Sequence, residues 1–335
     1  MSALALDIGT YSFKAIQAKP GKIPSIERVV TAPNPTKTAL PNDEASIDKL
    51  ASAIDAVLHD NSLDRSDVRL ALPETVVSTK VIEMPPLTDA ELASAVGWQA
   101  EQHIPIPPED LSLEYEVLFR PSRKEEKPMR VLLVGVRRQV VERYVEMFNR
   151  IGIEPVIIDT QLLAVIRSLG IEQRDPPTLL VHIGASTLDV GMLAQGELQF
   201  AVSQLSAGDM LTQTIERGIG LAREQAQEYK HAFGLDRSQL QGKVAEVLLP
   251  GVNLLVNEMK KAIQFYLSLH PQSKVQRLVL SGGTAQMPGF VPHLTTELGL
   301  EVLVAAPFGA ANGMVPSEIN QTSFTVCIGL LQHSV

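Results

Sequence analysis

Two short segments, one near the start of the chain and one past its middle, have the residue types of a phosphate-binding turn. Aligned without gaps, they pair Leu6-Asp7-Ile8-Gly9 with Val181-His182-Ile183-Gly184, and Lys14 then falls on Asp189. Each glycine permits a tight turn between two strands, and the backbone N–H groups of two such turns can converge on one anion. The repeat therefore indicates two glycine-turned hairpins that face each other across a cleft suited to the phosphates of a nucleotide.

A third glycine turn follows a predicted strand at residues 276–280. Its sequence is Leu280-Ser281-Gly282-Gly283-Thr284-Ala285. Two glycines after a strand are usually no more than a turn, so this segment alone specifies no ligand.

The elements that must position these turns alternate between strands and helices. Residues 4–8 and 13–18 are predicted strands, and Ser46 is the expected cap of a helix with one apolar face. Thr88 and Glu91 form a capping-box pair that opens a second helix, and long helices are predicted at 210–233 and 244–270. This alternation is typical of an α/β fold but identifies no activity.

The amino-acid composition limits the kinds of molecule that this protein can bind. The chain has 335 residues and a net charge of −9. This negative charge argues against binding to nucleic acid and against direct binding to anionic lipid. Its single cysteine, Cys327, excludes an internal disulfide and fits a reducing cytosol. The N-terminus does not resemble a signal peptide, and no apolar run approaches the roughly 20 residues that span a bilayer. We therefore expect a cytoplasmic protein whose membrane association, if any, comes through a partner.

The three turns stand in the order found in the superfamily of actin, sugar kinases and heat-shock chaperones. Residues 7–14 resemble its first phosphate motif, residues 182–189 its second, and residues 280–285 its adenosine motif. The resemblance implies an α/β, actin-like (ribonuclease-H-like) fold with duplicated lobes around a nucleotide cleft and a small inserted α/β subdomain. The expected division is a first lobe in two parts, 1–84 and 152–177, an inserted subdomain, 85–151, a second lobe, 178–305, and a closing helix region of the first lobe, 306–335.

Further segments resemble the PilM family of type IV pilus assembly proteins. They are Trp98-Gln99-Ala100-Glu101-Gln102-His103-Ile104-Pro105, Ala207-Gly208-Asp209, Ala226-Gln227-Glu228-Tyr229-Lys230 and Ile328-Gly329-Leu330. The resemblance implies a PilN-like inner-membrane partner, whose N-terminal cytoplasmic segment docks between the first lobe and the inserted subdomain. Trp98 and Ile104 are candidate groove residues, although a tryptophan on an amphipathic helix is more often part of a core. The groove would recruit the protein to the inner membrane.

The same resemblance assigns roles within the cleft, with ATP and Mg²⁺ as the expected ligands. Asp7 and Asp189 are expected to hold the ion through water, although Asp7 could instead accept hydrogen bonds from its own turn. Lys230 could contact the adenine or the ribose, or could be an ordinary exposed helical lysine. The expected nucleotide-binding residues are Asp7, Gly9, Thr10, Tyr11, Ser12, Lys14, Gly184, Ala185, Ser186, Thr187, Gly208, Asp209, Gln227, Lys230, Gly282, Gly283, Thr284 and Met287.

Three positions depart from the family pattern. His182 stands where an aspartate beside the magnesium is expected, and Gln227 replaces a ribose-binding glutamate. Gln161 replaces a glutamate and could position a water without removing its proton. We therefore expect nucleotide binding with slow or absent hydrolysis.

Two other functions remain open at this stage. A cell-division protein similar to FtsA shares the fold, but such proteins normally continue into an amphipathic membrane helix, whereas this sequence ends at Gln332-His333-Ser334-Val335. A metabolic kinase of the superfamily would need a carboxylate base facing a second substrate, and the sequence offers no specific candidate. Self-association is compatible with every one of these functions.

Overall fold

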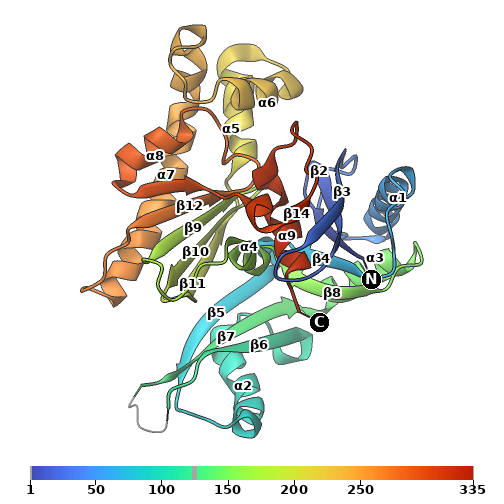
Figure 1. The fold of residues 1–335 in the computed structure, drawn as a ribbon, viewed down its shortest axis with the longest axis vertical. Coiled ribbons are helices and arrows are strands. Elements are labelled where there is room, and N and C mark those ends of the chain that lie inside the picture. Colours follow the sequence, from blue (N-terminus) through green and yellow to red (C-terminus); the bar gives the residue numbers. More distant parts are fainter. Residues whose placement is uncertain (1, 123–126, 335) are drawn as a thin grey trace.

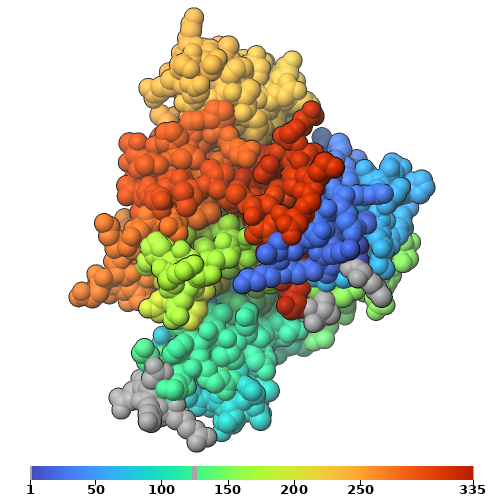
Figure 2. All heavy atoms as spheres, viewed as in Figure 1, coloured from blue at the N-terminus to red at the C-terminus, as the bar shows by residue number. Residues whose placement is uncertain are grey.

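The computed structural model describes residues 2–122 and 127–334. Within them the strands form three sheets, two of which belong to the halves of a duplicated body, while the third lies in a projecting subdomain (Figure 1). The spheres of Figure 2 show this subdomain, in green to cyan, below the two lobes.

The first lobe contains a six-stranded sheet in the order β14-β3-β2-β1-β4-β8. Its strands are β1 (Ala3–Ile8), β2 (Ser12–Lys19), β3 (Ser25–Pro33), β4 (Val68–Leu72), β8 (Pro155–Thr160) and β14 (Asn312–Gly313). Alternation along β1 places Leu4 and Leu6 on the face covered by α1 (Glu44–Asp60) and α3 (Arg138–Asn149). Ala3 and Ala5 point to the opposite face, against α4 (Gln161–Leu169) and α9 (Thr325–Leu331).

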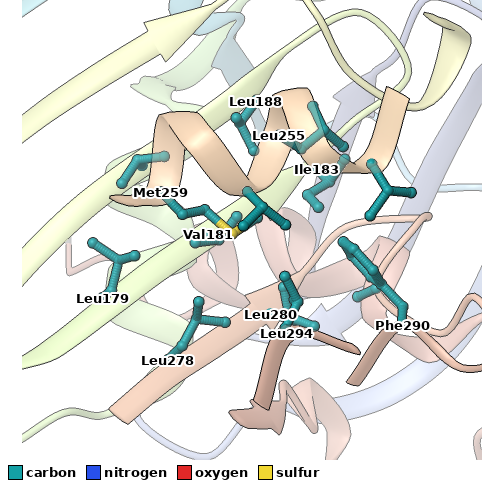
Figure 3. Packing of buried hydrophobic residues seen from close by; sticks show 14 of the residues in the cluster. Leu179, Val181, Ile183, Leu188, Leu255, Met259, Leu278, Leu280, Phe290 and Leu294 are labelled. Carbon is teal, nitrogen blue, oxygen red and sulfur yellow. The ribbon is translucent and has the colours of Figure 1, made fainter. Parts of the chain in front are cut away.

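The second lobe repeats this topology with a five-stranded sheet in the order β11-β10-β9-β12-β13. In both lobes three antiparallel strands are followed by two parallel ones. The strands are β9 (Thr178–Ile183), β10 (Leu188–Ala194), β11 (Glu197–Gln204), β12 (Arg277–Ser281) and β13 (Glu301–Val304). Figure 3 shows the core between this sheet and the helices α7 (Lys243–Leu269) and α8 (Phe290–Leu298), where Met259 lies beside Val181 and Leu255 near Leu188 and Ile183.

The expected long helix at 210–233 is interrupted. It consists of α5 (Gly208–Ile215), a π-helical turn at Glu216–Gly220, and α6 (Arg223–Ala232). The interruption contains Gly218 and Gly220, and Gly220 has a φ of +77°. Because a left-handed residue cannot continue an α-helix, the chain turns here and α6 takes a new direction.

Two boundaries differ from those expected. The first helix is capped by Asp43, whose side chain accepts from the backbone N–H of Ser46, so Ser46 completes a capping box three residues later. The inserted subdomain contains β5 (Val77–Met84), β6 (Leu111–Phe119), β7 (Met129–Arg137) and α2 (Asp89–His103). Its sheet thus begins near residue 77 rather than 85, because the prolines at 85–86 mark the approach to α2 and not the start of the sheet. Helix α3, expected within 85–151, packs on α1 in the first lobe.

Candidate nucleotide-binding cleft

A cavity of about 670 Å³ opens between the two lobes. This volume lies within the range of small-molecule sites in proteins. The cavity is lined by the turns of both hairpins, by the start of α5, by one face of α6 and by the glycine turn after β12.

The two hairpins that line it have the same geometry. Gly9 N–H donates to the Ser12 carbonyl at 3.1 Å, and Gly184 N–H donates to the Thr187 carbonyl at 2.9 Å. In the strand register, Asp7 of β1 pairs with Lys14 of β2. At the matching position of the second hairpin, His182 of β9 pairs with Asp189 of β10. The sequence repeat is therefore a structural repeat, with its polar pairs at matching positions.

In the first hairpin, Asp7 faces the cavity and is already engaged. Its Oδ1 accepts from Gln161 Nε2 at 2.8 Å, and its Oδ2 lies 3.7 Å from Lys14 Nζ. Gln161 begins α4 directly after β8, which β4 separates from β1 in the sheet, and its side chain extends to this carboxylate. An amide can orient a water molecule at this point but has no proton-accepting group of suitable pKa.

In the second hairpin, His182 lines the cavity while its strand partner Asp189 does not. His182 Nδ1 lies 2.9 Å from Ser281 Oγ, and burial lowers the pKa of the imidazole to about 4, so it is neutral at pH 7. Asp189 is 1% exposed and accepts from Thr187 Oγ1 at 2.9 Å and from Ser203 Oγ at 2.5 Å. Burial raises the pKa of its carboxyl to about 6.

The tips of the hairpins touch. Thr10 Oγ1 and Ser186 Oγ are 2.8 Å apart. Beside them Arg223 of α6 donates to the hydroxyl of Tyr11 at 2.8 Å, and its guanidinium lies 4.9 Å from the centre of that ring. Arg223 also forms an ion pair with Asp209. The Thr10–Ser186 and Arg223–Tyr11 contacts join the first lobe to the second beside the cavity, whereas the Arg223–Asp209 pair lies within the second lobe.

Helix α6 presents one face to the cavity. Gln227 and Lys230 line it, and Arg223 lies one turn earlier on the same face. Lys230 is 5% exposed, which excludes an ordinary surface lysine, and its Nζ donates to the Gly208 carbonyl and to Thr212 Oγ1, both at 2.9 Å. Burial lowers the pKa of its ammonium to about 8. Lys230 thus fixes the turn that carries Gly208 and Asp209.

The glycine turn after β12 also lines the cavity. Gly282 has a φ of +89°, and a Cβ there would stand 2.4 Å from the Ile183 carbonyl oxygen, so only glycine fits. Gly283 differs, because a Cβ there would meet no atom within 4 Å. Asn320 Nδ2 donates to the Gly283 carbonyl at 2.9 Å, which ties the turn to the segment before α9.

The family model described as "Type IV pilus assembly protein PilM" matches residues 5–331. The chain belongs to the PilM family. Its expected actin-like α/β fold is confirmed by three solved structures.

The first of these structures is a PilM-PilN type IV pilus biogenesis complex, whose matched chain is 23% identical, with a TM-score of 0.84 over 99% of this chain and 98% of that one. The ethanolamine utilization protein EutJ from Carboxydothermus hydrogenoformans is 15% identical, with a TM-score of 0.61 over 99% and 89% of the two chains. MreB 5 of Spiroplasma citri, bound to AMPPNP, is 13% identical, with a TM-score of 0.54 over 98% and 94%.

Most residues expected to form the nucleotide site of this PilM-family protein do gather around the cavity. Met287 and Asp189 are not among the lining residues, because Met287 packs into the core of the second lobe and Asp189 bonds to its own hairpin. Four residues at or beside the cavity were not predicted from the sequence: Arg223, His231, Lys37 and Asn320. The motifs contain none of them, although the i, i+4, i+7 spacing of Arg223, Gln227 and Lys230 would have indicated one helix face.

The two candidate groove residues of the inserted subdomain differ in exposure. Trp98 is 61% exposed on α2, whereas Ile104 is 3% exposed and packs over Gly135 of β7. Ile104 therefore supports the subdomain core, and Trp98 presents its ring on the surface. No helix within residues 2–122 and 127–334 is long and apolar enough to cross a bilayer.

Proposed function

We propose that this protein is a cytoplasmic nucleotide-binding assembly protein of a type IV pilus or related inner-membrane platform. It would bind the N-terminal cytoplasmic segment of a PilN-like membrane protein, which recruits it to the inner membrane. Family membership supports the setting, and the solved complex supports the kind of partner.

The observation that carries nucleotide binding is the pair of matching hairpins around one cavity. Their turn residues at 9–12 and 184–187 face the same space, with Lys14 beside the first turn. Phosphates would lie against these turns, the ribose near Asp209 and Gln227, and the adenine near the turn at Gly283 and Thr284. ATP is the ligand that this arrangement fits.

Hydrolysis in this cleft should be slow or absent. The group nearest Asp7 is the amide of Gln161, which can hold a water in place but cannot take its proton. His182 is neutral and adds no positive charge at the phosphates. The nucleotide would act mainly by holding the two lobes together.

The partner surface that we propose lies around Trp98, on α2 of the inserted subdomain. Trp98 is the only tryptophan of the chain and most of its ring is exposed. An exposed aromatic ring that loses its water to an apolar peptide side chain is a typical interface anchor.

The test is titration of a peptide with the N-terminal sequence of the PilN-like protein, followed by tryptophan fluorescence and calorimetry. We expect saturable binding that shifts the Trp98 emission, and a loss of affinity of about tenfold or more in Trp98→Ala. Phe265→Ala, which removes a half-exposed ring on α7 of the second lobe, is the matched control and should bind normally. Normal binding by Trp98→Ala would place the partner elsewhere.

A further inference from the structure

The cleft offers a magnesium ion only one of the two expected carboxylates, and that carboxylate already has two partners. Of the two carboxylates expected to hold it, only Asp7 lines the cavity, and its two oxygens face Gln161 Nε2 and Lys14 Nζ. Asp189 is buried and its oxygens accept from Thr187 and Ser203. Magnesium is usually held by one or two carboxylates together with phosphates and water.

His182, which stands where a second acidic residue was expected, makes the site still less suited to magnesium. His182 occupies the strand position that matches Asp7, and it presents an imidazole with Nδ1 already next to Ser281 Oγ. Imidazole nitrogen is a poor ligand for a hard cation. Among the described residues, no group of three or more His, Cys, Asp or Glu side chains could hold a metal ion.

Lysine side chains provide the positive charge instead. Lys14, Lys37 and Lys230 line the cavity, against the two carboxylates Asp7 and Asp209. The charge of Asp209 is in turn offset by Arg223. Lys14 Nζ lies 3.0 Å from the point where a Cβ on Gly9 would stand, so its ammonium sits directly over the first phosphate turn.

We infer that this cleft binds its nucleotide without a divalent cation, with Lys14 and the turn amides neutralising the phosphates. The ligand would be metal-free ATP or ADP. This inference rests on the proposed nucleotide binding and specifies the chemical form in which the nucleotide is taken up. It also gives a reason for slow hydrolysis, because phosphoryl transfer depends on metal ions that neutralise the developing charge.

The test is calorimetric titration of ATP and ADP into the full chain, in EDTA and in excess Mg²⁺ at matched ionic strength. We expect the two dissociation constants to agree within about threefold. Lys14→Gln should weaken binding in EDTA by more than about tenfold, since it removes the cation over the turn. Lys80→Gln, at an exposed site on β5, is the matched control and should change nothing.

A second variant restores what the site lacks. His182→Asp places a carboxylate opposite Asp7, and we expect it to make ATP binding depend on Mg²⁺ by about tenfold or more. Thermal denaturation checks that His182→Asp folds. If this variant does not fold, the comparison of wild-type ATP binding in EDTA and in Mg²⁺ still tests the inference. Wild-type binding strengthened about tenfold by Mg²⁺ would overturn the inference. An absence of ATP binding in both buffers would instead overturn the proposed nucleotide function.

Discussion

The hydroxyl oxygens of Thr10 and Ser186 lie 2.8 Å apart, although the two residues belong to different lobes. The two hairpin turns therefore contact each other at this point. A phosphate group bound by both turns must enter between them, so the distance between Thr10 and Ser186 should change with the occupancy of the cleft.

A disulfide at this point should lock the cleft. In the double variant Thr10→Cys, Ser186→Cys, the two side chains are close enough to bridge under oxidation. We expect the oxidised protein to lose ATP binding by more than about tenfold and the reduced protein to regain it. The single native thiol, Cys327, is fully buried and should not interfere. Each single-cysteine variant is the control, and normal ATP binding by the bridged protein would contradict this account of the turns.

Arg223 should slow the escape of bound nucleotide. Its contact with Tyr11, which lines the cavity, joins the second lobe to the first. A hydrogen bond from a charged group contributes about 1.5 kcal/mol or more, so Arg223→Gln should raise the ATP dissociation rate by roughly tenfold. Stopped-flow displacement of a fluorescent ATP analogue measures this rate.

Two further variants sharpen this experiment. Tyr11→Phe removes the accepting hydroxyl but keeps the ring under the guanidinium, so an intermediate rate is expected. Arg217→Gln, an exposed arginine in the neighbouring π-helical turn, should leave the rate unchanged. Equal rates for Arg223→Gln and Arg217→Gln would show that Arg223 does not hold the cleft closed.

The buried carboxyl of Glu74 should make stability depend on pH. Burial and the nearby Asp189 raise the pKa of Glu74 from 4.5 to about 8. A raised carboxyl pKa means that the folded protein binds more protons than the unfolded chain between these values. The contribution of Glu74 to the free energy of unfolding is therefore largest below about pH 4.5. This contribution is lost as pH rises to about 8.

Glu74→Gln removes this titration and keeps the oxygen that accepts from the Leu162 N–H at 2.8 Å. Near pH 5 the variant and the wild type should have similar melting temperatures. At about pH 8.5 the variant should melt at least ~2 °C higher. A variant that melts lower than the wild type at both pH values would show that Glu74 stabilises the fold in its ionised form.

Gly329 should be essential for the contact between α9 and α4. A Cβ at this position would stand 1.7 Å from the carbonyl oxygen of Ala164, so the two helices must separate to admit it. We expect Gly329→Ala to destabilise the protein by about 3 kcal/mol or more in denaturant unfolding. Gly97→Ala is the matched control, because a Cβ there meets nothing on α2, and it should stabilise by about 0.5–1 kcal/mol. Similar unfolding midpoints for the two variants would contradict the close packing.

The parts of this structure that local sequence encodes could be predicted. The hairpins were visible because Asp7, Gly9 and Lys14 lie within eight residues, and the repeat at His182 gave the second hairpin. The contacts that close the cleft could not be read in the same way. Arg223 reaches Tyr11 only because the chain turns at Gly220, and the apolar pattern predicted one continuous helix there.

The direction of the Asp189 side chain could not be predicted from the sequence repeat. The repeat placed it opposite His182, and the register agrees. Whether a side chain at such a position faces the cavity depends on its neighbours, and the hydroxyls of Thr187 and Ser203 hold this carboxylate within the lobe. Ser203 lies on β11, so the deciding contact came from pairing between strands and not from the motif.

The measurement that tests the nucleotide cleft most directly is calorimetric titration of ATP into the wild type and Gly283→Leu. Gly283 lines the cavity, and a side chain there would project into open space, so the leucine should fill the adenine side without disturbing the fold. We expect ATP to bind the wild type and Gly97→Ala alike, and to bind Gly283→Leu more than about tenfold more weakly. Equal affinity for all three proteins, or no binding to the wild type, would contradict a nucleotide site in this cleft.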